Sequence, residues 1–237
     1  MACPISRNSS ARAADGAGMN VVLAMIGELV APSRCAACDA LIAPRVLFCA
    51  PCGVAVLHAG PQPGGQHAVF EYGGAIATAI VRLKYAGRFD LAARFGPVMA
   101  SVIAPSSFDL VVPVPLHPSR LAERGFDQAA LLAGPVARDL RLPLLTRALL
   151  RTRATPRQAS LDRRARASNV DAAFLCARPR AVGGRRVLLV DDVRTTGATL
   201  AACTSALLVS GAATVATLVL ASRDREENGE KVAHDDG

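Results

Sequence analysis

Aromatic side chains are scarce in this sequence, which has no tryptophan, two tyrosines and seven phenylalanines among 237 residues. The core must therefore be aliphatic, since 51% of the residues are hydrophobic and only 4% are aromatic. Few rings are available to stack on nucleobases, so any binding of nucleic acid should be mainly electrostatic. The sequence also lacks the roughly 18 consecutive apolar residues that a membrane-spanning helix needs, and we expect no membrane span.

Acidic residues are outnumbered by basic ones, with 19 Asp and Glu against 27 Lys and Arg and a formal net charge of +8. This balance favours anionic partners. Most of the basic residues are arginines, whose planar side chains bind phosphate in a bidentate manner. The base composition of the genome is a simpler explanation of the high alanine and arginine content. The charge therefore indicates a class of partner without naming one.

The seven cysteines are an odd number, which argues for a reducing compartment and against a disulfide framework. Four of them form the spacing CxxC-x10-CxxC, which is typical of a structural zinc site: Cys35, Cys38, Cys49 and Cys52. Such a site supplies roughly 10–16 kcal/mol of apparent binding energy to a module with little core. Four unrelated buried cysteines and a redox-active CxxC are the alternatives. We expect structural zinc and a cytoplasmic protein.

The most informative stretch runs from Arg186 to Leu200. Val187 to Val190 is an unbroken apolar run, which predicts a strand buried on both faces of a parallel sheet. Asp191 and Asp192 follow, then a turn of small residues and a helix from about Thr199 to Val209. Ligands of open α/β sheets bind beyond the carboxyl ends of the strands, and a helix N-terminus favours phosphate. The pattern predicts a site for a ribose 5-phosphate, with its hydroxyls on the acids.

An acidic turn in any doubly wound protein is the plain alternative, but the order of apolar strand, two acids and Thr-Thr-Gly-x-Thr is specific. The stretch resembles the phosphoribosyl pyrophosphate (PRPP) motif of type I phosphoribosyltransferases. That resemblance implies that Asp191 and Asp192 bind the ribose hydroxyls, and that Mg²⁺ accompanies PRPP. The residues that it assigns to the 5-phosphate are Thr195, Thr196, Gly197, Ala198 and Thr199.

The rest of the chain alternates between expected strands and helices, which predicts an α/β fold with a parallel sheet and helices on both faces. We expect strands at 67–72, 109–116, 144–150 and 214–221, and helices at 74–83, 91–103 and from a loop after 116 to about 140. The expected domains are a disordered tail at 1–18, an N-terminal helix and zinc module at 19–58, an α/β domain at 67–223 and a disordered tail at 224–237. A Gly- and Pro-rich linker at 59–66 separates module and domain, so the module should unfold alone when zinc is removed.

Basic residues that are candidates for pyrophosphate or DNA contacts gather in three places. They are Lys84, the pair Arg120 and Arg124, and a segment with Arg151, Arg153, Arg157, Arg163, Arg164 and Arg166. Ordinary explanations compete with this one. Lys84 also suits the C-terminal dipole of a helix, and the arginines also suit solvated loops.

Two further motifs narrow the resemblance. The runs LKYAGR and PVPLHPSRLAERGFDQ, which follow the cysteine pairs in that order, are similar to the ComF family. This family is the competence-associated branch of the phosphoribosyltransferase fold. The resemblance implies that the arginine-rich segment at 151–169 is a mobile hood over pyrophosphate. Asp127 stands where family members usually have Asn, which lowers the local positive charge.

Three functions compete at this point. The first is a ComF-like role in DNA uptake, with single-stranded DNA and other competence or DNA-processing proteins as partners. The second is transfer of ribose 5-phosphate from PRPP to a nitrogen acceptor, with loss of pyrophosphate. The third is a sensor that binds PRPP or a nucleotide without catalysis. The acids and the turn support PRPP binding under all three, and no side chain stands out as a base for an acceptor.

Overall fold

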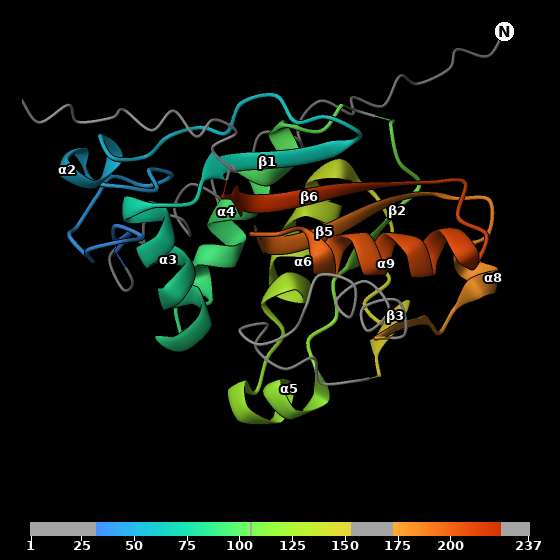
Figure 1. Cartoon of the computed structure of the whole chain (residues 1–237). Helices are drawn as coiled ribbons and strands as arrows, with labels where there is room; N and C mark the ends of the chain where they lie inside the picture. The colour runs from blue at the N-terminus through green and yellow to red at the C-terminus, as the bar shows by residue number, and fades with distance from the viewer. Residues whose placement is uncertain (1–31, 105, 153–172, 224–237) are drawn as a thin grey trace, which may run out of the picture.

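A computed structural model describes residues 32–104, 106–152 and 173–223 of the chain. Its centre is a four-stranded parallel sheet in the order β1 (Gln66–Glu71), β6 (Thr214–Ser222), β5 (Arg186–Arg194) and β2 (Leu110–Pro113). β3 (Leu149–Arg151) and β4 (Phe174–Cys176) form a separate antiparallel pair. The expected parallel sheet is thus present (Figure 1).

Helices cover both faces of the sheet, as the sequence predicts. One face packs on α3 (Gly74–Tyr85), α4 (Asp90–Ser101) and α6 (Gln128–Leu140), and the other on α9 (Ala198–Val209) (Figure 1). The residues of β5 alternate between the two cores. Leu188 and Val190 belong to the first, and Val187 and Leu189 to the second. All four are completely buried, which explains why the strand has no polar residue there.

The contact between α4 and α6 depends on a glycine. A Cβ atom at Gly96 would collide with the ring of Pro135, so any larger residue would force the two helices apart. Asp127 begins α6 as its N-cap, where its Oδ1 accepts a hydrogen bond from the amide of Ala130 at 3.1 Å. The close packing at Pro135 fixes the middle of α6 on α4, and the N-cap bond fixes where the helix begins.

Four expectations differ from the structure. The strand expected at 144–150 is wrong, because only Leu144 bridges to β2 before a turn at Thr146 and Arg147 carries the chain away to β3. The loop after residue 116 contains a helix, α5 (Pro118–Arg124), and the turn before β5 contains the short α8 (Pro179–Val182). β5 itself runs through both acids to Arg194, because Asp191, Val193 and Arg194 stay paired with β6.

The N-terminal module packs directly on the α/β core. It contains the short α2 (Ala50–Gly53), and Ala36, Leu47 and Phe48 belong to or pack against the same apolar cluster as α3 and α4. The expected linker is also engaged, since the amide of Ala59 donates to the carbonyl of Val69 in β1 at 3.0 Å. These contacts argue against a module that unfolds alone.

Several expectations fall on residues outside the described ranges. These are the two tails, the helix at 19–31, and most of the arginine-rich segment, with Arg153, Arg157, Arg163, Arg164 and Arg166. Within the described ranges, no helix is long and apolar enough to cross a membrane.

Candidate functional site

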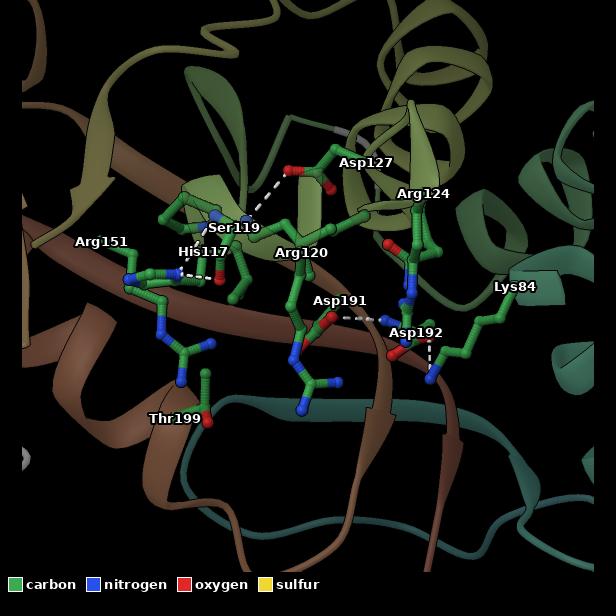
Figure 2. A pocket seen from close by; sticks show the side chains of 15 residues that line it. Lys84, His117, Ser119, Arg120, Arg124, Asp127, Arg151, Asp191, Asp192 and Thr199 are labelled. Carbon is green, nitrogen blue, oxygen red and sulfur yellow. Dashed lines mark hydrogen bonds and ion pairs between the residues drawn. The ribbon is translucent and has the colours of Figure 1, made fainter. Parts of the chain in front are cut away.

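Two adjacent acids lie at the carboxyl end of β5, in the centre of the sheet. The amide of Asp192 donates to Asp191 Oδ1 at 2.8 Å, which fixes the side chain of the first acid. Asp192 is 8% exposed, and its Oδ2 forms an ion pair with Lys84 (Figure 2). Both carboxylates line a cavity of about 410 Å³. The strand therefore delivers two acids to one cavity with a single direct cationic partner between them among the described residues.

This arrangement disfavours two negative charges. Burial, and then the neighbouring Asp192, raise the pKa of Asp191 well above its usual range. A carboxylate in this state gains from any group that donates a hydrogen bond to it or brings a positive charge. Sugar hydroxyls supply the first and a hydrated divalent cation the second. The acids are therefore suited to a ligand that carries both.

Lys84 reaches the acids from the last turn of α3. The sequence left open whether it serves the helix dipole or a phosphate; the structure adds a third role, because its amine pairs with Asp192. Its side chain is 22% exposed and still faces the cavity, so a ligand anion can share this cation.

Three of the predicted arginines line the same cavity. Arg120 and Arg124 come from α5, and Arg151 comes from the end of β3 (Figure 2). Arg151 also stacks over the ring of Phe174, at 5.4 Å from its guanidinium carbon to the ring centroid. The cavity thus combines acids at its floor with four basic side chains. Its lining is Lys84, Val114, Pro115, Leu116, His117, Ser119, Arg120, Arg124, Asp127, Gln128, Ala129, Arg151, Asp191, Asp192 and Thr199.

Asp127 is a lining residue that the sequence did not assign to the site. Its Oδ2 accepts from the amide of Leu116 at 3.1 Å while Oδ1 caps α6, so it joins the loop after β2 to the helix. Burial raises the pKa of Asp127. The two bonds use different carboxylate oxygens, so an Asn in the same orientation would keep only one of them. The N-cap pattern before an alanine-rich helix was the available signal.

The small-residue turn divides two cavities. Gly197 adopts φ 76°, a left-handed conformation that favours glycine, and caps α9. Thr199 faces the acids, whereas Thr195, Thr196, Gly197 and Ala198 line a second cavity of about 840 Å³. That cavity is bounded by the segment 60–66, where Gln62 and Gln66 hydrogen-bond to Arg194. Of the turn residues, only Thr199 lines the acidic cavity directly.

The four predicted zinc ligands come together. Their sulfur atoms all lie within 4.8 Å of one another. Burial raises the pKa of Cys35, but amide hydrogen bonds from Cys38, Cys49 and Ala37 outweigh it and lower the pKa to about 6. The thiols of Cys49 and Cys38 in turn raise the pKa of Cys52 to about 12. Four thiolates at this spacing need a cation, and Zn²⁺ with its tetrahedral thiolate shell fits them.

The cysteine cluster is connected to the acidic cavity. Asp39, directly after Cys38, accepts hydrogen bonds from Arg82 and Arg88. In the sequence, these two arginines flank Lys84. Arg82 also donates to the carbonyl of Ala37 at 2.7 Å. The module therefore holds the end of α3 from which Lys84 reaches Asp192.

Comparison with known proteins identifies relatives whose family matches the fold described above. Residues 127–236 match the family model described as a phosphoribosyl transferase domain. The DNA utilization protein YhgH of Escherichia coli O157:H7 is 31% identical over 198 residues, which cover 76% of this chain and 86% of that protein. The chain belongs to the ComF family. Competence protein ComFC of Bacillus subtilis is 29% identical over 159 residues, covering 65% of this chain and 63% of its own. Competence protein F of Haemophilus influenzae is 40% identical over 93 residues, covering 39% and 41%.

Membership of the ComF family confirms the fold expected from the sequence, a phosphoribosyltransferase-like α/β domain preceded by a four-cysteine module. It also gives the coarse role: relatives are named for competence and for DNA utilization. The assignment of individual residues to PRPP, pyrophosphate or DNA stays a prediction.

Proposed function

We propose that this ComF protein binds PRPP, or a related ribose phosphate, in the cavity that contains Asp191 and Asp192. The observation that carries the proposal is the acidic pair itself, the half-buried Asp191 and the buried Asp192 at the carboxyl end of the central strand. Acids in this position cost stability unless a ligand uses them. The same cavity holds the cations that a pyrophosphate needs, so it accommodates the ribose and the pyrophosphate, while the turn that borders it on the side of the second cavity is left for the 5-phosphate.

Each part of the site then has a distinct task. Asp191 and Asp192 accept hydrogen bonds from the ribose hydroxyls, and the amides before α9 bind the 5-phosphate. Lys84, Arg120, Arg124 and Arg151 neutralise pyrophosphate. Mg²⁺, when bound with PRPP, offsets further negative charge and brings water ligands to the acids. Zn²⁺ at the four cysteines is structural, because a closed thiolate shell leaves no position for a substrate.

Calorimetric titration with PRPP, with and without Mg²⁺, tests the binding directly. We expect saturable binding that is stronger with Mg²⁺, because the metal reduces repulsion between pyrophosphate and the acids. Ribose 5-phosphate should bind more weakly, since it cannot use the basic side chains. If neither ligand binds a folded protein at millimolar concentration, the proposal fails. Pyrophosphate release in the same solution separates transfer from sensing.

We further propose that the protein acts on single-stranded DNA in the cytoplasm. The names of its relatives and the net charge of +8 support this. Contact by four to six arginines from the segment 151–166 predicts that log affinity falls with log salt at a slope of roughly −3 to −4. Replacing Arg163, Arg164 and Arg166 by Ala should flatten that slope by about two units for every sequence tested.

A matched control removes the same charge elsewhere. Arg138, Arg141 and Arg180 are exposed and lie beside the amino ends of the strands, so their replacement by Ala should leave the slope nearly unchanged. Fluorescence anisotropy across a salt series measures all three proteins. Equal slopes for the two triple variants would show that the arginine-rich segment is not the DNA site.

A further inference from the structure

Several of the few aromatic rings of this protein lie beside the acidic cavity. Tyr85 is the last residue of α3, Phe89 immediately precedes α4, and Phe126 follows α5. The rings of Phe89 and Phe126 meet edge to face, with centroids 4.5 Å apart. Arg124 stacks over Tyr85, with its guanidinium carbon 4.7 Å from the ring centroid. Tyr85, Phe89, Arg124 and Phe126 are called the stacking platform below.

The stacking platform is open to solvent. Tyr85 is 66% exposed and Phe89 is 47% exposed, although both are large rings that a protein core would readily bury. The hydroxyl of Tyr85 accepts a hydrogen bond from Arg124 at 2.6 Å, which fixes the tyrosine ring against the arginine. The ring is therefore held in place before any partner arrives. Stacking of a planar partner on it then costs little further side-chain entropy of Tyr85.

The position of the stacking platform indicates the chemistry of its partner. Lys84 and Asp127, neighbours of Tyr85 and Phe126 in the chain, line the acidic cavity, and so does Arg124 itself. Arg120 stands one turn before Arg124 on α5. Flat rings next to several cations match a single strand of nucleic acid, whose bases stack on rings while its phosphates bind arginine and lysine.

We infer that the stacking platform binds an unpaired base of single-stranded DNA at the mouth of the acidic cavity. This inference rests on the proposed DNA function and goes beyond it. The DNA contacts proposed above are purely electrostatic, whereas the stacking platform gives the strand a contact with its bases. Stacking is tolerant of sequence because every base has a flat face, so the contact need not select a particular sequence.

The absence of tryptophan makes a clean test available. Tyr85→Trp places the only tryptophan of the protein in the stacking platform, and oligo(dT) should quench its emission to saturation. Val209→Trp, at the last residue of α9 and 86% exposed in the parent, is the matched control and should be quenched little. Equal quenching of the two reporters would contradict the inference.

Affinity measurements separate stacking from charge. Tyr85→Ala should lower the affinity for oligo(dT) roughly 5- to 150-fold, the range measured for one base stacked on a ring. Tyr85→Phe keeps the ring and should stay within about threefold of the parent. An abasic strand of equal length should bind the parent and Tyr85→Ala equally, because it offers phosphates but no bases.

Failure of this inference is distinguishable from failure of the proposed function. If the parent does not bind single-stranded DNA at all, the DNA function and the stacking platform fall together. If the parent binds and Tyr85→Ala binds equally well, only the stacking platform is overturned. The stacking platform is likewise overturned if Tyr85→Ala weakens normal and abasic strands alike, since the ring would then merely hold Arg124 or serve a protein partner.

Discussion

Acids lie at both ends of β5 in opposite circumstances, with Asp109, the residue before β2, at the amino end and Asp191 and Asp192, from β5 itself, at the carboxyl end. At the amino end, Asp109 accepts three hydrogen bonds from Arg186, the first residue of the strand, at 2.8, 2.8 and 3.3 Å. These bonds lower the pKa of Asp109 to about 2. At the carboxyl end, burial and the neighbouring Asp192 raise the pKa of Asp191 well above its usual range. The same residue type is stabilised as an anion at one end and destabilised at the other.

The difference shows which end serves a ligand. An acid that is fully paired with an arginine contributes to the fold and gains nothing from a further cation. An acid beside another acid is a poor structural contact, and it persists where binding needs it. The carboxyl end is also the end where ligands of open α/β sheets bind. Electrostatics and topology therefore point to the same end of the strand.

Removal of zinc should have the largest effect, because the cysteine module supports α3, from which Lys84 reaches the carboxyl end of β5. The module holds α3 through Asp39 and shares its apolar core, so its loss should disturb Lys84 and the acids. We expect chelation to lower Tm by more than about 10 °C and to weaken PRPP binding. Readdition of Zn²⁺ is the control. A Tm that does not change with zinc content would contradict the shared core.

Replacement of Lys84 by Met should have the next largest effect. It leaves Asp192 without its cation, and loss of one partner from a mostly buried pair costs about 2–4 kcal/mol. PRPP affinity should also fall about tenfold or more, since a pyrophosphate contact is lost. Denaturant unfolding and calorimetry measure the two effects. Lys84→Arg retains the charge and should recover most of both; if it behaves like Met, charge is not the property that matters.

The smallest effects should have opposite signs at the two ends. The pKa of Asp109 is depressed in the folded protein, so its contribution to stability is present above the ordinary value of 3.8 and lost as pH falls through about 2. Asp109→Asn should therefore lower Tm at pH 7 by an amount that vanishes in acid. The pKa of Asp191 is raised, so the folded protein is stabilised below 3.8 and loses that stability as pH rises.

Asp191→Asn should consequently raise Tm at pH 7, because it removes a carboxyl group that lies beside Asp192 but retains the oxygen that accepts from the amide of Asp192. Thermal unfolding of the two single variants across pH checks both signs. A lower Tm for Asp191→Asn at neutral pH would mean that the acid is a structural group like Asp109.

The sequence was sufficient for the central strand and for the cysteine cluster. Val187 to Val190 form a short β-branched and aliphatic run that is typical of a strand buried on both faces, and the spacing of four cysteines indicates their grouping. Both signals are local. Contacts between distant segments leave no such trace, and Asp39 bound to Arg82 and Arg88 is an example, since either arginine also suits a solvated helix end.

Two differences between expectation and structure have different causes, and the sequence could have predicted the first. His117 and Pro118 at the start of α5 and the left-handed Gly125 at its end are ordinary helix boundaries, yet the density of Pro and Gly indicated a loop. The strand expected at 144–150 failed for another reason. Its apolar residues serve two purposes, since Leu144 bridges to β2 while Leu149 pairs with β4.

Calorimetric titration of Mg²⁺·PRPP into the double variant Asp191→Asn, Asp192→Asn tests the central claim most directly, with Asp109→Asn as the control from the other end of the strands. Circular dichroism confirms that each variant is folded. We predict that the double variant loses at least about 100-fold in affinity, as expected for two hydrogen bonds to charged acceptors, while Asp109→Asn binds within about twofold of the parent. A folded double variant that binds PRPP as tightly as the parent would contradict the assignment of these acids to the ribose.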